Sequence, residues 1–282
     1  MSLNLFNTIG IGVAFSPNLE ANINEASRLS LYLNSKLILI HVGEFSEEKS
    51  NKFKSLLKPY KEQGLQFEIV FKPGKPVDVI LQTIEDSRID LLLLGALKRE
   101  KLVNFYLGSI ARKITRKAKC SILLLTHPSV NREICEHIVV NGLDEKQTEQ
   151  TVTSAIYMAH KFGSKSVTIV EEISKQKLSI TVEDDTSLRK SNIEKVKLKR
   201  LEEERVDAIL KNIPEDYKAN LKIKSQPIFG TSGYSIGHYT EVVRADLLVM
   251  NAPKKLTFWD RIFPHDIEYI LTELPSDVLI VR

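Results

Sequence analysis

Asp90-Leu91-Leu92-Leu93-Leu94 is an unbroken apolar run behind one acidic residue, and it returns 156 residues later as Asp246-Leu247-Leu248-Val249-Met250. Strands of this composition are buried on both faces, as in a parallel sheet that is covered by helices. Ser121-Ile122-Leu123-Leu124-Leu125 returns at the same distance as Asp277-Val278-Leu279-Ile280-Val281. Two pairs of buried strands at one spacing indicate two copies of a single α/β unit.

The amino-terminal part of each copy repeats at a shorter distance of 129 residues. The strand expected at 9–13 then matches 138–142, and the amphipathic helix pattern of 23–33 matches that of 152–162. The two distances differ by 27 residues, so the second copy carries an insertion of that length, at about residues 183–211. This segment is rich in both signs of charge and predicts a long surface helix, with its apolar face formed by Leu198, Leu201, Val206 and Ile209.

Strands and helices alternate in each copy, in the order β-α-β-α-β-α-β-α-β. Right-handed crossovers then give the fold class α/β, with two tandem doubly wound three-layer domains, each built on a five-stranded parallel sheet. We place the domains at residues 1–130 and 131–282. Ligands bind such a sheet beyond the carboxyl ends of its strands, where the strand order reverses. In the first copy this crevice should follow Val13 and Leu94.

Charge and cysteine content exclude several classes of protein. The 40 Lys and Arg residues exceed the 36 Asp and Glu residues by only four, which is not the charge of a nucleic-acid binder. Cys120 and Cys135 form no CxxC pair, which favours a reducing compartment. The longest apolar stretch, residues 89–97, is too short to span a bilayer. We therefore expect a cytoplasmic protein without a nucleic-acid or membrane partner.

A spaced motif follows the strand at 91–94. It reads Gly95, two residues, Lys98, nine residues, and then Gly108-Ser109. With Leu-Ile-His-Val at 39–42, this motif resembles the universal stress protein (UspA) family, whose nucleotide signature is Gly, two residues, Gly, nine residues, Gly-Ser/Thr. The resemblance covers nearly the whole chain, twice. It implies the adenine nucleotide alpha hydrolase-like fold and a regulatory protein of the stress response, and members with an intact signature bind ATP.

The resemblance places the nucleotide-binding positions of the first copy at Ala14, Gly95, Lys98, Gly108 and Ser109. The free N–H groups that open a helix at Gly108-Ser109 suit phosphate oxygens. Two positions depart from the family pattern. Lys98 replaces the second glycine, where it either fills the phosphate pocket or supplies a cation to phosphate. Ala14 stands where the family often has an acidic residue that contacts adenosine.

The second copy lacks every signature glycine. Its aligned positions are Asn251, Lys254, Pro264 and His265. We therefore expect ATP or another adenine nucleotide in the first domain only. We also expect the two copies to pair within the chain through their last strands, as an intramolecular pseudo-dimer. A homodimer of the whole chain is left open.

The alternative function is enzymatic, either a slow ATPase or a serine hydrolase that uses Ser235. Gly233-Tyr234-Ser235-Ile236-Gly237 fits the G-x-S-x-G pattern, and Asp246, Asp260 and His265 follow in a suitable order. However, the repeat places Ser235 inside a helix. Near Gly95–Ser109 no residue stands out as a general base, so we expect no enzyme and no catalytic residue. No histidine spacing predicts a metal site, and we interpret His41 and Cys120 as structural residues.

Overall fold

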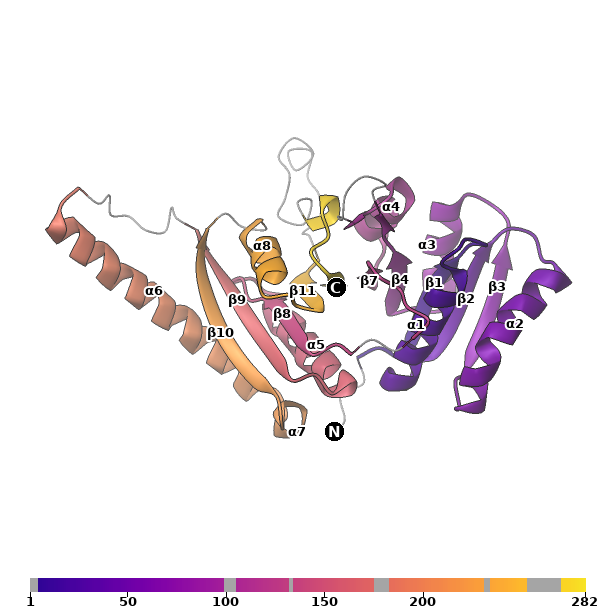
Figure 1. The fold of residues 1–282 in the computed structure, drawn as a ribbon, viewed down its shortest axis with the longest axis horizontal. Coiled ribbons are helices and arrows are strands. Elements are labelled where there is room, and N and C mark those ends of the chain that lie inside the picture. Colours follow the sequence, from indigo (N-terminus) through magenta and orange to yellow (C-terminus); the bar gives the residue numbers. More distant parts are fainter. Residues whose placement is uncertain (1–4, 99–104, 132–133, 175–182, 231–233, 253–269) are drawn as a thin grey trace. The chain divides into compact units, whose positions relative to one another are not determined.

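The computed structural model describes residues 5–98, 105–131, 134–174, 183–230, 234–252 and 270–282. Its contacts divide the chain into two compact units, one of Met1–Ile134 with Leu271–Arg282, the other of Cys135–Ile270. Each unit is a mostly parallel sheet with helices packed on it, as the sequence predicts (Figure 1). The expected five parallel strands are present in the first unit, which also has one antiparallel strand, whereas the described part of the second unit has four. The second unit ends at Ile270, whereas the second sequence repeat continues to the last strand of the chain.

The first unit begins with strands and helices in strict alternation and has a short hairpin after its fourth strand. Its elements are β1 Thr8–Val13, α1 Leu19–Leu33, β2 Lys36–Val42, α2 Glu47–Glu62, β3 Phe67–Lys72, α3 Pro76–Asp86, β4 Leu91–Gly95, β5 Leu97–Lys98, β6 Phe105–Tyr106, α4 Ser109–Lys117, β7 Ser121–Leu125 and, from the end of the chain, β12 Asp277–Val281.

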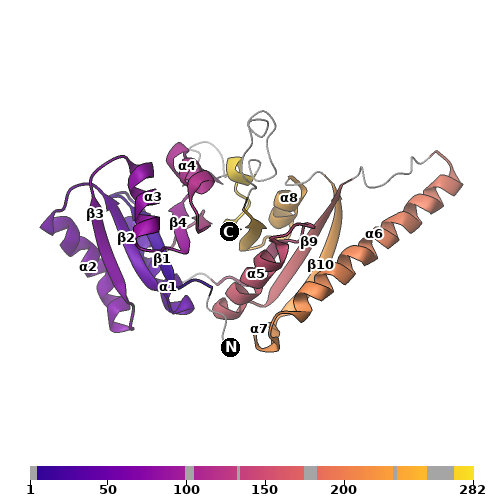
Figure 2. The ribbon, with the colours of Figure 1, turned by 180° about the vertical axis from the view of Figure 1, so that it is seen from behind.

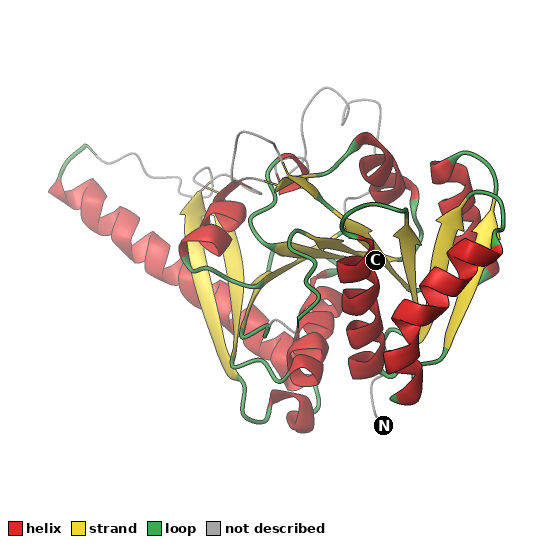
Figure 3. Cartoon of the chain, turned by 45° about the vertical axis from the view of Figure 1, so that its right-hand side comes forward, coloured by secondary structure: helices red, strands yellow, loops and turns green. Residues whose placement is uncertain are grey.

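The order of strands in this unit is β3-β2-β1-β4-β7-β12. Strands β1, β2, β3, β4 and β7 are parallel, and the strand order reverses at β1, which pairs with β2 on one side and β4 on the other. Helices α1 and α2 pack together, as do α3 and α4. Figure 3 shows the helices, in red, lying against the strands, in yellow. The order therefore reverses between β1 and β4, which is where the sequence places the ligand crevice.

The second unit repeats the first half of this plan. Its elements are β8 His137–Asn141, α5 Thr148–Phe162, β9 Ser166–Ser174, α6 Asp185–Lys211, α7 Glu215–Lys218, β10 Lys222–Gly230, α8 Tyr234–Val242 and β11 Leu247–Asn251. The strand order is β10-β9-β8-β11, with every pair parallel. Helices α5 and α6 pack together on the sheet (Figure 2). Helix α6 has the place that α2 has in the first unit, but it has 27 residues where α2 has 16.

One acidic side chain begins the fourth strand of each repeat and fixes the start of the first strand. The carboxylate of Asp90 accepts hydrogen bonds from the backbone N–H groups of residues 7–8, at 2.9 and 3.2 Å. The carboxylate of Asp246 accepts from those of residues 136–137, at 2.8 and 2.9 Å. An ionised acceptor makes stronger hydrogen bonds than a neutral one, so each carboxylate stabilises the start of its strand. The repeat found in the sequence thus extends to single hydrogen bonds.

Three predictions about single side chains have mixed outcomes. Cys120 is buried just before β7, and burial raises the pKa of its thiol to about 11, so it is an unreactive core residue. The inserted segment is a helix, and Val206 is buried on it. The prediction for Leu201 was wrong, because this side chain is 52% exposed. The buried face of α6 is centred on Ser191, Leu198 and Val206, and Leu201 lies about 90° away from its middle.

Candidate functional site

The predicted nucleotide positions of the first unit lie at or next to the carboxyl ends of β1 and β4. Ala14 follows β1 directly and is exposed, and Gly95 is the exposed last residue of β4. The backbone of Lys98 lies in β5, whereas its side chain is outside the described part of the structure. Gly108 caps α4, and Ser109 is its exposed first residue. The topology therefore brings the ends of the two motifs to one edge of the sheet.

A short hairpin returns the chain from Gly95 to Gly108. Strands β5 and β6 pair antiparallel, with Lys98 opposite Phe105. A Cβ added to Gly108 would lie 2.9 Å from the side chain of Leu97, so a glycine permits this close return. The nine-residue spacing of the motif is thus explained by a hairpin, which the sequence analysis did not predict.

Helix α4 begins at this edge with the features of an anion site. Its first helical hydrogen bond runs from the N–H of Arg112 to the carbonyl of Gly108, so the N–H groups of residues 109–111 have no helical acceptor. The first turn carries no acidic residue, and the helix contains Arg112, Lys113, Arg116 and Lys117. The backbone dipole favours a negative ligand there, and Arg112 and Lys113 follow within the next turn, whereas Arg116 and Lys117 lie in the last turn.

Asn22 is a residue of the crevice that the sequence analysis missed. It lies in the first turns of α1, and its carboxamide oxygen and nitrogen are 3.7 and 3.9 Å from the Cβ position of Gly95. Its oxygen is buried and has no hydrogen-bond partner in the described structure. An unpaired buried acceptor costs free energy, typically about 1–3 kcal/mol. The sequence feature that could have revealed this residue is an asparagine in an otherwise apolar helix pattern.

The equivalent positions of the second unit are paired with each other. Asn22 and Gly95 correspond to Thr151 and Asn251 through the two repeat distances. The hydroxyl of Thr151 donates to the carboxamide oxygen of Asn251, and the carboxamide nitrogen donates to Glu145 at 2.9 Å. Asn251 and Thr151 are buried. The second crevice is therefore filled by its own side chains. Of the other aligned positions, Lys254, Pro264 and His265 are outside the described residues.

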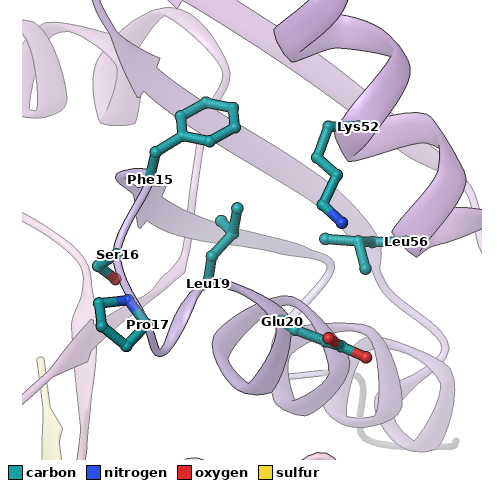
Figure 4. A pocket seen from close by; sticks show the side chains of 7 residues that line it. All are labelled: Phe15, Ser16, Pro17, Leu19, Glu20, Lys52 and Leu56. Atoms are coloured by element: carbon teal, nitrogen blue, oxygen red, sulfur yellow. The ribbon is translucent and has the colours of Figure 1, made fainter.

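A pocket of about 390 Å³ lies beside the crevice, next to the loop that follows β1. Figure 4 shows the aromatic ring of Phe15 on one side, Lys52 and Leu56 of α2 on the other, and Leu19 between them. Ser16, Pro17 and Glu20 complete the lining. The ring of Phe15 is 51% exposed, so an apolar surface faces solvent at this edge.

Aromatic rings pack against Phe15, which lines the pocket. His41, at the end of β2, contacts Phe15, Phe53 and Phe71 with ring centroids 5.5–5.7 Å apart. Its Nδ1 atom is 3.1 Å from the carbonyl oxygen of Val13. His41 is buried, and it contacts both the end of β1 and Phe15 in the loop that follows.

Two neighbouring carboxylates of β9 point to opposite faces of the second sheet, as alternate residues of a strand do. Glu172 accepts a hydrogen bond from the N–H of Ile236 in α8, at 2.8 Å. Glu171 faces α6 and is 1% exposed. The hydroxyl of Ser225 donates to both of its carboxylate oxygens, at 2.8 and 3.1 Å. Burial raises the pKa of Glu171 to about 7, although Arg205 of α6 opposes the shift.

The residues of the alternative hydrolase do not come together. Ser235 lies inside α8, as predicted, and its hydroxyl packs against Gly230, where a Cβ would be only 2.0 Å away. Asp246 lies before β11, at the amino ends of the strands, where it holds residues 136–137. Ser235 follows the carboxyl end of β10, at the opposite edge of this parallel sheet. Asp260 and His265 are outside the described residues.

Comparison with known proteins finds a family that matches the first repeat. The model of the universal stress protein family matches residues 5–126. The first repeat is therefore similar in sequence to the universal stress protein family. Universal stress protein MJ0531 of Methanocaldococcus jannaschii is 27% identical over 82 residues, which are 29% of this chain and 48% of that protein. Universal stress protein Sll1388 of Synechocystis is 27% identical over 93 residues, 33% of this chain and 60% of that protein.

The chain thus matches about half the length of these universal stress proteins. The likeness in structure extends further. The crystal structure of a universal stress protein from Archaeoglobus fulgidus covers 98% of both chains with a TM-score of 0.67, at 16% identity. A protein of Pseudomonas aeruginosa covers 99% of this chain, with a TM-score of 0.70 and 13% identity. At such identities the likeness shows the fold, and it does so for both repeats.

Proposed function

We propose that this chain is a universal stress protein, a regulatory binding protein that takes an adenine nucleotide, with ATP as the first candidate, in its first unit only. The base and sugar would lie at the carboxyl ends of β1 and β4, near Ala14 and Gly95. The phosphates would lie at the start of α4, on the N–H groups of Gly108 and Ser109. The free backbone donors and the basic residues of α4 support an anionic ligand.

The observation that carries this proposal is the contrast between the two repeats. In the first, Gly95 leaves the crevice without a side chain, and the buried oxygen of Asn22 has no partner in the described structure. In the second, Asn251 occupies the same place and is bonded to Thr151. The first repeat therefore has space for a nucleotide, whereas in the second repeat hydrogen-bonded side chains occupy the equivalent space.

Isothermal titration with ATP tests the proposal. We expect one site per chain in the wild type. The substitution Gly95→Asn copies the second repeat and should weaken binding about tenfold or more, because it puts a carboxamide into the crevice. Its Cβ has room, since the nearest atom is 3.7 Å away. Two equal sites per chain, undetectable binding to the wild type, or unchanged binding by Gly95→Asn would contradict the proposal.

A second glycine provides a matched control. Gly163 ends α5 in a left-handed conformation, and no atom lies within 4 Å of its Cβ position. Asn34 has the equivalent place in the first repeat, with a φ of 55°. The substitution Gly163→Asn should therefore fold normally and bind ATP like the wild type. This control separates the effect of an asparagine in the crevice from any general effect of replacing a glycine by asparagine.

Lys98 tests how the phosphates are held. We propose that it supplies a cation to phosphate, since Gly95, Gly108 and Ser109 keep the family spacing around it. The substitution Lys98→Gly should then weaken ATP binding about tenfold or more, and less so at high salt. Tighter binding by this variant would show instead that the lysine fills the pocket.

Binding is favoured over turnover by the chemistry of the described site. The crevice offers backbone donors, one carboxamide and one hydroxyl, and none of these is a general base. The serine-hydrolase alternative needs Ser235 with an acid, and Asp246 lies at the opposite edge of the sheet. We therefore propose that ATP bound by the chain is hydrolysed no faster than its rate in buffer, which a phosphate-release assay measures.

A further inference from the structure

The inserted helix α6 is held on the sheet of its unit by its carboxyl-terminal half. Val206 is buried, and Arg205 donates to the carbonyl oxygen of Gly142 and pairs with Glu202 at 2.8 Å. Farther along, the Asn212 side chain donates to Glu149 at 3.0 Å. The helix is about 40 Å long at 27 residues, and its amino-terminal turns extend away from β10 (Figure 1).

The opposite face of α6 carries a stripe of residues that recur at steps of four and three. A helix with this period presents one continuous seam, as in coiled coils. The middle of the seam is apolar and faces solvent, since Ile193 is 69% and Val196 67% exposed. The seam consists of Arg189, Ile193, Val196, Arg200, Glu203 and Asp207.

Charge is divided along this seam. Its amino-terminal part has the cations Arg189 and Arg200, and its carboxyl-terminal part has the acids Glu203 and Asp207. Arg189 and Asp207 are exposed and have no hydrogen bond or ion pair within the described ranges of the chain. The two ends of the seam are therefore complementary to each other but too far apart on one helix to meet.

We infer that this seam is an interface for α6 of a second copy of the chain, with the two helices antiparallel. In that orientation Arg189 of each helix lies opposite Asp207 of the other, at both ends of the helix pair. Each remaining seam residue also lies opposite a seam residue of the partner helix. Val196 then packs against the aliphatic stem of Arg200, and Ile193 against that of Glu203. A parallel pair would place Arg189 on Arg189 and Asp207 on Asp207, which repels.

The seam has few apolar layers, so we expect a weak dimer that depends on protein concentration and salt. Sedimentation velocity of the full chain, up to roughly 1 mM, measures it. The substitution Arg189→Asp puts two acids opposite each other at both ends and should weaken the dimer about tenfold or more. Asp207→Arg should do the same. The charge swap Arg189→Asp with Asp207→Arg should restore the dimer.

Both changes suit the helix, because Asp near its start and Arg near its end complement the helix dipole. Lys54→Asp, at an exposed site of α2, makes the same change of net charge and should leave the dimer unchanged. A monomer at every concentration, or a charge swap no tighter than either single variant, overturns the inference. So does a wild-type monomer that binds phosphatidylcholine vesicles with about 30% phosphatidylserine through Arg189, since the partner is then a lipid surface.

Discussion

Glu171→Gln is expected to raise the free energy of unfolding of the second unit by about 3 kcal/mol at about pH 8, because the folded protein raises the pKa of this carboxyl from 4.5 to about 7. Between these pH values the native state keeps a proton that the unfolded state has lost. Stability of the wild type therefore falls as the pH rises through this window and is level above it. Glutamine stays neutral and avoids the loss.

The surroundings of Glu171 permit this substitution. The hydroxyl of Ser225 can rotate to accept from the new amide, and Arg205 retains Glu202 as its partner. Glu203 of α6 is the other charge that affects this carboxyl. Urea denaturation followed by circular dichroism, at about pH 5 and about pH 8, measures the effect. Glu68→Gln, at an exposed site of β3, serves as the control. An equal difference at both pH values would refute the argument.

Much of the fold could be predicted because its determinants are local in the sequence. The apolar runs after Asp90 and Asp246 predict strands that are buried on both faces, and in the structure both runs are buried strands. The acidic residue before each run was visible as part of the repeat. That its carboxylate binds the start of another strand was not visible, since this contact joins segments 82 or more residues apart.

The candidate site shows where sequence reasoning stops. The motif from Gly95 to Ser109 predicted which residues gather, because strand ends of a parallel sheet share one edge. It did not predict the hairpin of β5 and β6, since its spacing of nine residues fits many loops. The pairing of Thr151 with Asn251 depends on two side chains from different elements. Only their positions in three dimensions show that one crevice is open and the other filled.

The last strand of the chain pairs with the last strand of the first repeat, antiparallel and in a symmetric register. Leu279 lies opposite Leu123, and each of these two residues is the repeat equivalent of the other. The neighbouring pairs show the same symmetry, because Val278 lies opposite Leu124 and Ile280 lies opposite Ile122. The pairing of last strands expected from the sequence is thus found, and β12 covers an edge of β7 that would otherwise be bare.

Leu279→Ala should therefore destabilise the first unit, although residue 279 belongs to the second sequence repeat. Leu279 is fully buried, and loss of such a side chain typically costs about 2–5 kcal/mol. Amide hydrogen exchange in β7 should speed up accordingly, because opening of this strand becomes easier. Val167→Ala, at a fully buried site of β9 in the second unit, should leave exchange in β7 at its wild-type rate. If Val167→Ala speeds exchange in β7 as much as Leu279→Ala does, the last strand does not stabilise the first unit selectively.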